Sequence, residues 1–68
     1  MSQGEPASAE LIAALARFVQ KFEKSGGVTA AAKELVLSRL TITSVLAGLE
    51  VRRGTLAQLR EKLGVREA

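Results

Sequence analysis

The sequence predicts an all-α domain, a compact bundle of four to five short helices. Apolar residues recur at steps of three and four, the spacing that places side chains on one face of a helix. Serine, threonine and glycine residues separate these stretches where helices would begin and end. A chain of 68 residues has room for one hydrophobic core. We therefore expect a single domain over residues 7–68, preceded by a polar, flexible tail over residues 1–6.

The first helix is expected to begin near Ala7 or Ser8 and to run to about Lys24. Consecutive glycines supply the left-handed backbone that ends a helix and starts a turn, so Ser25-Gly26-Gly27 should close it. The apolar stripe of this helix comprises Leu11, Leu15, Phe18 and Phe22, widened by Ile12 and Val19.

Two shorter helices follow. Thr29 is the expected N-cap of the second, which should run through about Leu35. Ser38 can cap a third helix from Arg39 to about Ala47, closed by Gly48.

The interior of the third helix is rich in β-branched residues, which favour a strand by propensity alone. Its apolar residues nevertheless recur with helical spacing, and we expect a helix because periodicity is the stronger signal. This apolar set is Ile42, Val45, Leu46 and Leu49.

A fourth helix is expected from Thr55, because Thr55 and Gln58 have the spacing of a capping box. Gly64 should end it, with Val65 packing back on the last turn. The buried face of this helix comprises Leu56, Leu59 and Leu63. No strand and no internal repeat is expected.

Composition argues against several classes of function. The chain has no cysteine and no histidine, which removes zinc sites, disulfides, thiol nucleophiles and imidazole acid–base chemistry. Carboxylates are few and unpaired, so we expect neither an enzyme nor a cofactor, metal or small-molecule ligand. The longest apolar run, Leu11 to Ala16, is far shorter than the roughly 20 residues of a membrane span. A cytoplasmic location is expected, since no signal-peptide pattern occurs.

The net charge of +3 is unevenly distributed. Residues 1–27 hold three basic and three acidic residues, whereas residues 28–68 hold seven basic and four acidic ones. This excess favours a polyanionic partner. The apolar residues are mostly Ala, Leu and Val, with two Phe and no Trp or Tyr. Such small side chains stabilise a lone domain weakly, so a homodimer is expected.

The segment from Val28 to Leu46 has the pattern of a helix-turn-helix. Ala31 and Ala32 are small enough to let two helices cross closely, and Ile42 and Val45 should point into the core. The third helix then presents polar, apolar and cationic side chains outward, and such groups read base edges in the major groove. The outward set is Ser38, Arg39, Leu40, Thr43, Ser44 and Ala47.

Two groups of residues add a family resemblance. The first is Ala32, Leu37, Ser38, Ile42 and Val45, followed by Leu46-Ala47-Gly48; the second runs from Arg53-Gly54-Thr55-Leu56 to Leu63-Gly64-Val65. With these residues the chain resembles the Cro/λ-repressor-like family of XRE-type regulators over Val28 to Val65, which implies a λ-repressor-like fold and double-stranded DNA as the partner. The base-reading positions that it implies are Ser38, Arg39, Leu40, Thr43 and Ser44. The phosphate-binding positions expected from it are Thr29, Ala30, Lys33, Arg52 and Arg53.

Two positions depart from the family pattern. Val36 stands in the turn where the family usually has Gly. A β-branched residue at positive φ is strongly disfavoured, so the turn either has another geometry or stores strain. Ala30 stands where many members have Gln, which weakens one phosphate contact.

We therefore expect a sequence-specific regulator that binds double-stranded DNA as a homodimer and represses transcription by blocking polymerase. One recognition helix reads few base pairs, so pairing on an inverted repeat with half-sites about 34 Å apart is expected. The alternative is a protein-interaction module, antitoxin-like or an adaptor, that keeps the bundle without sequence-specific DNA binding. Salt dependence separates the two, because DNA binding releases counterions and a helix-in-groove contact does not.

Overall fold

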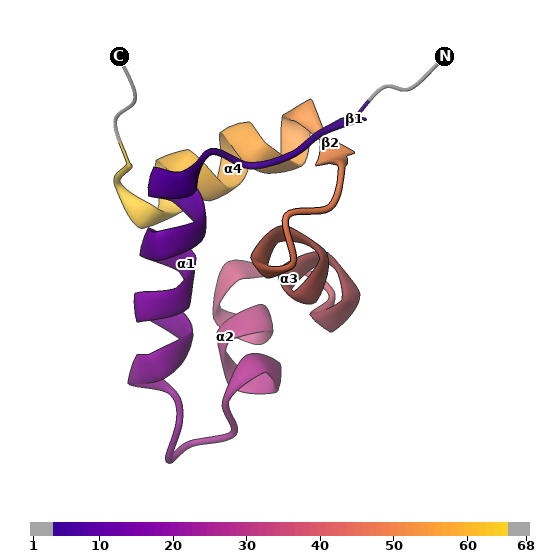
Figure 1. Cartoon of the computed structure of the whole chain (residues 1–68). Helices are drawn as coiled ribbons and strands as arrows, with labels where there is room; N and C mark the ends of the chain where they lie inside the picture. The colour runs from indigo at the N-terminus through magenta and orange to yellow at the C-terminus, as the bar shows by residue number, and fades with distance from the viewer. Residues whose placement is uncertain (1–3, 66–68) are drawn as a thin grey trace.

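The structure, a computed structural model that describes residues 4–65, holds four helices and two short strands in that range. The helices pack around one core, and the strands pair above α3 (Figure 1). The expected compact, mostly helical domain is confirmed. In chain order the elements are β1 (Gly4–Glu5), α1 (Ala9–Lys21), α2 (Val28–Leu35), α3 (Arg39–Leu46), β2 (Val51–Arg52) and α4 (Arg53–Leu63).

The first helix, α1, begins where the sequence predicts and ends earlier. Ser8 is its N-cap, and the Ser8 Oγ accepts a hydrogen bond of 3.2 Å from the Leu11 N–H. The last helical residue is Lys21 rather than Lys24. The chain leaves the helix there because the next residues form hydrogen bonds of the tighter i to i+3 type, which end in a turn.

The turn after α1 decides where α2 begins. The Gly27 N–H donates to the Phe22 carbonyl at 2.6 Å, and Gly27 has φ 58° and ψ −129°. Only glycine adopts this backbone conformation without strain. Gly27 is therefore the N-cap of α2, and Thr29, the predicted cap, lies in the first turn instead. The prediction for Thr29 was wrong because it considered only side-chain capping.

The third helix, α3, forms despite its β-branched residues. Ser38 is its N-cap as predicted, and its Oγ accepts from the Thr41 N–H at 3.1 Å. Ile42 and Val45 are both 0% exposed. Burying two such side chains contributes about 1.5–3 kcal/mol each, which exceeds the few tenths of a kcal/mol by which β-branched residues disfavour a helix.

The fourth helix, α4, begins at Arg53, before the predicted Thr55. Its N-cap is Arg52, which makes no side-chain capping hydrogen bond. Arg52 is also the last residue of β2, so the chain passes directly from strand to helix. The predicted helix start and capping box at Thr55 and Gln58 were therefore wrong. Gly64 ends the helix in the left-handed conformation, as predicted.

The two strands contradict the expectation of a strand-free chain. They run antiparallel, with Gly4 opposite Arg52 and Glu5 opposite Val51. A Cβ on Gly4 would lie 3.2 Å from the Val51 carbonyl oxygen, so a larger residue there would require β2 to shift by a few tenths of an ångström. Two-residue strands are too short to show alternation in a sequence. Gly4 and Glu5 of the predicted flexible tail therefore belong to the fold, whereas residues 1–3 of that tail lie outside the described residues.

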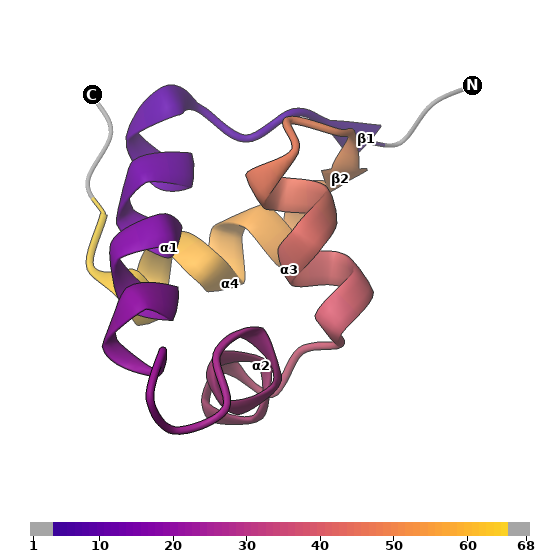
Figure 2. The ribbon, with the colours of Figure 1, turned by 60° about the horizontal axis from the view of Figure 1, so that its bottom comes forward.

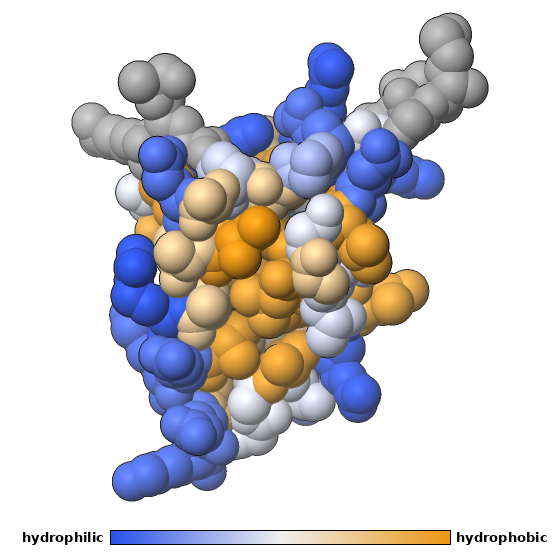
Figure 3. Space-filling model, in the orientation of Figure 1, coloured by the Kyte–Doolittle hydropathy of each residue, from blue (hydrophilic) through white to orange (hydrophobic). Residues whose placement is uncertain are grey.

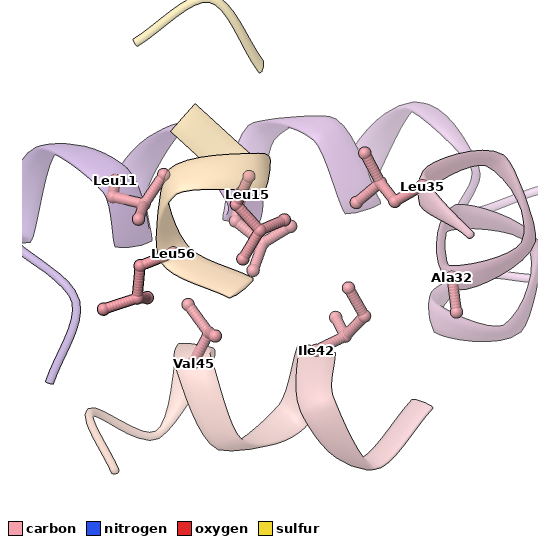
Figure 4. Close-up of a cluster of buried hydrophobic side chains, with 8 residues drawn as sticks. Leu11, Leu15, Ala32, Leu35, Ile42, Val45 and Leu56 are labelled. Carbon is pink, nitrogen blue, oxygen red and sulfur yellow. The ribbon is translucent and has the colours of Figure 1, made fainter. Parts of the chain in front are cut away.

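The core is formed by all four helices. In Figure 4, Leu11 and Leu15 of α1 lie opposite Val45 and Ile42 of α3, with Leu56 of α4 between them. No polar or charged side chain within residues 4–65 is buried. The fully buried set is Leu11, Leu15, Ala31, Ala32, Leu35, Ile42, Val45, Leu56 and Leu59. Val65 packs against this set from beyond α4, as predicted.

Contacts with α1, α2 and β2 hold α3 in place. α2 and β2 both contact α3, and α1 contacts each of the other helices. Figure 2 shows α4 lying behind α1 and α3, with α2 beside the start of α3. One side of α3 consequently faces away from the bundle. In the described part of the chain, no helix combines the length and apolar character that a membrane crossing requires.

Candidate nucleic-acid interface

The rotation of α3 about its axis is set by its two buried residues. Because Ile42 and Val45 point into the core, side chains on the other side of the helix point outward. Arg39, Leu40 and Thr43 are exposed, and we call these three residues the α3 outer face. Leu40 is 74% exposed and adds an apolar side chain to this face.

The remaining two predicted base-reading residues are less available. Ser44 is half-buried beside the inner side of α3. Ser38 is exposed, but its Oγ accepts from the Thr41 N–H and lies 2.8 Å from the Thr41 Oγ1. The Ser38 hydroxyl, which is the group that would contact a base, is therefore already engaged in capping α3. The sequence analysis did not identify Thr41 as the hydrogen-bond partner of Ser38. Its position three residues after an N-cap serine is the signal that could have identified it.

The α3 outer face offers three kinds of recognition group. The Thr43 Oγ1 donates to the Arg39 and Leu40 carbonyls at 3.1 and 3.0 Å, which commits its proton and leaves the oxygen as an acceptor. The Arg39 guanidinium makes no hydrogen bond or ion pair with another residue in the 4–65 range. Leu40 adds an apolar group. A donor fork, an acceptor and an apolar tip therefore share one exposed surface.

The predicted phosphate-binding residues lie on α2, on β2 and at the first residue of α4, and of these elements α2 and β2 contact α3. Thr29 and Lys33 are exposed on α2, and Ala30 is half-buried in the first turn of that helix. The first backbone N–H groups of a helix lack partners within it and favour anions. Arg52 and Arg53 are exposed where β2 passes into α4.

Arg53 contacts a residue that the sequence did not indicate as part of the site. Glu5, on β1, has its Oε2 at 3.8 Å from the Arg53 Nε. Nothing in the sequence signals this pair, because it joins β1 to the first residue of α4, far away along the chain. Exposed ion pairs of this kind contribute about 0–1 kcal/mol, so Glu5 leaves Arg53 able to exchange partners. The pairing of β1 with β2 fixes the position of Arg52 on a strand that contacts α3, and Arg53 follows it directly.

The turn between α2 and α3 resolves the question raised by Val36. Its φ of 58° and ψ of 44° place it in the left-handed region, so the turn has the geometry that favours glycine. The Leu37 N–H donates to the Ala32 carbonyl at 2.9 Å and closes the end of α2. Val36 is 76% exposed. It therefore contributes little burial, while its left-handed backbone costs about 1–3 kcal/mol.

Replacing Val36 by glycine is expected to raise the free energy of unfolding by about 1 kcal/mol. The gain is the relief of left-handed strain, reduced by the greater freedom of glycine in the unfolded chain. Urea denaturation followed by circular dichroism measures it. Val36→Ala, which keeps a Cβ, is the matched control and should give a smaller gain. A lower stability for Val36→Gly would show that Val36 is not strained.

The described residues offer no site for a metal. No three His, Cys, Asp or Glu side chains come together anywhere in residues 4–65.

Comparison of the chain with family models, with curated proteins and with solved structures finds no match. The functional assignment therefore depends on the geometry of α2, α3 and β2 and on the chemistry of their exposed side chains.

Proposed function

We propose that this chain binds double-stranded DNA in a sequence-specific manner, with α2 and α3 acting as a helix-turn-helix of the Cro/λ-repressor-like kind. The observation that carries the proposal is the orientation of α3. Burial of Ile42 and Val45 leaves Arg39, Leu40 and Thr43 exposed on one surface. An α-helix fits the B-DNA major groove, and base edges there are read by such side chains.

Each residue of the α3 outer face has a base-edge partner of matching chemistry. The Arg39 guanidinium suits bidentate donation to guanine O6 and N7. Leu40 suits contact with a thymine methyl group, and the Thr43 oxygen can accept from an adenine or cytosine amino group. Arg39 also stands at the positive end of the helix dipole, where a cation is mildly unfavourable. A residue placed against local electrostatics supports a functional role.

The phosphate contacts would come from both sides of α3. The first N–H groups of α2, with Thr29 and Lys33, would hold one backbone segment, and Arg52 and Arg53 the next. We propose further that the protein binds as a homodimer and represses transcription at an inverted repeat, since one reading helix specifies too few base pairs.

Arg52→Ala and Arg53→Ala are each expected to weaken binding to all duplexes alike. Each should also make the dependence of log K on log salt concentration shallower by about one, because one phosphate contact is lost. Fluorescence anisotropy of a labelled duplex at several salt concentrations measures both quantities. Lys24→Ala, an exposed cation outside the proposed interface, is the control and should leave the slope unchanged. If neither arginine changes the slope, they belong to a solvated surface.

A second candidate function is favoured by one observation. Figure 3 shows an apolar area in the middle of that view, between α1 and α3, with hydrophilic side chains around it. Leu49, after α3, is also 57% exposed. Apolar surface of this kind is typical of protein-interaction sites, and a module that binds only protein would use it in place of DNA.

Salt dependence decides between the two functions. Three cationic phosphate contacts per protomer (Lys33, Arg52 and Arg53) predict that affinity for duplex DNA falls about fortyfold between 50 and 200 mM salt for one protomer, and more steeply for a dimer. The same titration with duplexes of different sequence tests specificity. Affinity that is absent at low salt, or that stays constant across this range, would contradict DNA binding and favour the protein-interaction module.

A further inference from the structure

A groove lies between α1 and the end of α4, formed by residues that the proposed DNA contacts do not use. It has a volume of about 310 Å³, enough for one or two side chains of a partner. The residues that line it are Ala14, Arg17, Phe18, Lys21, Lys62 and Leu63.

The floor of the groove is apolar and held in place. Ala14, Phe18 and Leu63 are half-buried, and Phe18 packs against the core. The Phe18 and Phe22 rings lie 5.2 Å apart at 54°, within the preferred range for aromatic pairs. This contact restricts the Phe18 ring, so the floor can receive an apolar group without reordering.

The charged residues that line the groove are all cationic. Arg17, Lys21 and Lys62 belong to it, and no carboxylate does. Lys62 is anchored, because its Nζ donates to the Leu35 carbonyl oxygen at 2.7 Å across to the end of α2. An ammonium group has three donors, so the remaining ones can face a ligand. Apolar floor and cationic rim together match a ligand that carries an apolar side chain flanked by carboxylates.

We propose that this groove binds an acidic amphipathic helix of another protein. Docking of a helix by its apolar side into a groove is a recurring mode of peptide recognition, and here the rim would select glutamate or aspartate beside the apolar anchor. A second copy of this chain does not fit, because α1, α2 and α4 each contain one glutamate and α3 contains none. DNA does not fit either, because phosphates would leave the apolar floor exposed to water.

The site lies apart from the α3 outer face, so a partner could bind while DNA is held. The inference thus goes beyond the proposed DNA binding and does not require it. Its chemistry also differs: the ligand needs apolar contact as well as negative charge.

The test uses a synthetic helical peptide with a leucine stripe flanked by glutamates, titrated into the ¹⁵N-labelled full chain. Backbone amide shifts are expected to change at the groove, from Ala14 to Lys21 and around Lys62 and Leu63. Combining Arg17→Gln with Lys21→Gln should weaken peptide binding about fivefold, because two exposed ion pairs are lost. Lys33→Gln with Arg39→Gln removes equal charge elsewhere and should weaken it less than twofold. A peptide with lysines in place of the glutamates should not bind.

Four results would overturn the proposal: no binding of the acidic peptide, shifts located away from the groove, equal losses in the two double variants, or equal binding of the lysine peptide. The last measurement is the affinity of the Arg17 and Lys21 double variant for duplex DNA. At 150 mM salt the screening length is about 8 Å, so charges far from the DNA have little effect on this affinity. The Arg17 and Lys21 double variant should keep its DNA affinity within twofold. If it loses DNA affinity as strongly as peptide affinity, the groove belongs to the DNA interface and the proposal fails, while DNA binding itself stands.

Discussion

Leu15→Ala is expected to lower the free energy of unfolding by about 2–5 kcal/mol. Leu15 is 0% exposed and lies among side chains of α1, α3 and α4 (Figure 4), so its removal leaves a cavity that rigid neighbours cannot fill. Domains are stable by roughly 0.05–0.15 kcal/mol per residue, which for 68 residues is about 3–10 kcal/mol. The loss is therefore a large fraction of the total stability, and the variant should unfold at a much lower urea concentration than the unchanged chain.

Urea denaturation followed by circular dichroism at 222 nm measures this loss. Leu40→Ala is the matched control, because it removes the same atoms from an exposed position and should change stability by less than about 0.5 kcal/mol. Equal losses at Leu15 and Leu40 would contradict the packing described here. The comparison also tests the orientation of α3, since Leu40 is costly to truncate only if it faces the core.

Arg39→Ala is expected to cost about 1–3 kcal/mol in DNA affinity, and only with duplexes that carry the preferred base at one position. The reason is that a bidentate contact to one base edge is lost, while phosphate contacts remain. Competition binding with duplexes altered at single positions measures it. Arg52→Ala provides the contrast, with uniform losses across all duplexes. Equal losses for Arg39→Ala on preferred and random DNA would contradict its role as a base reader.

The helices were predictable because their signals are local. Apolar spacing identified the inner faces of α1, α3 and α4, and Ser8 and Ser38 mark starts that the structure confirms. Leu49 is the exception, because α3 ends at Leu46 and Leu49 is 57% exposed. Ile42 and Val45 illustrate the strength of this signal, since their periodicity gave the correct orientation of α3 against their β-propensity.

The errors arise where backbone conformation or distant contacts decide the structure. Gly27 rather than Thr29 caps α2, because a glycine conformation set by the preceding turn determines the start. The pairing of Gly4 and Glu5 with β2 starts α4 at Arg53, and two-residue strands from opposite ends of the chain leave no periodic pattern. Such contacts depend on the assembled core and cannot be read from neighbouring residues.

The candidate site was predictable to a similar degree. Helical spacing placed Arg39, Leu40 and Thr43 outward, and all three are exposed. Spacing alone could not show that the Ser38 hydroxyl is engaged in capping or that Ser44 is half-buried. Residue type and position identify which side chains reach the surface, whereas hydrogen bonds decide which of them remain available for a ligand.

Selection of binding sites from random duplex DNA tests the central claim most directly. If the α3 outer face reads bases, the selected duplexes should share a short sequence, and a homodimer should yield two inverted copies with centres about 34 Å apart. The same selection with Arg39→Ala should yield a sequence that has lost its preference for guanine at one position. That loss would show that α3 reads the selected sequence. Recovery of duplexes with no common sequence, by protein that is folded and at low salt, would contradict the account.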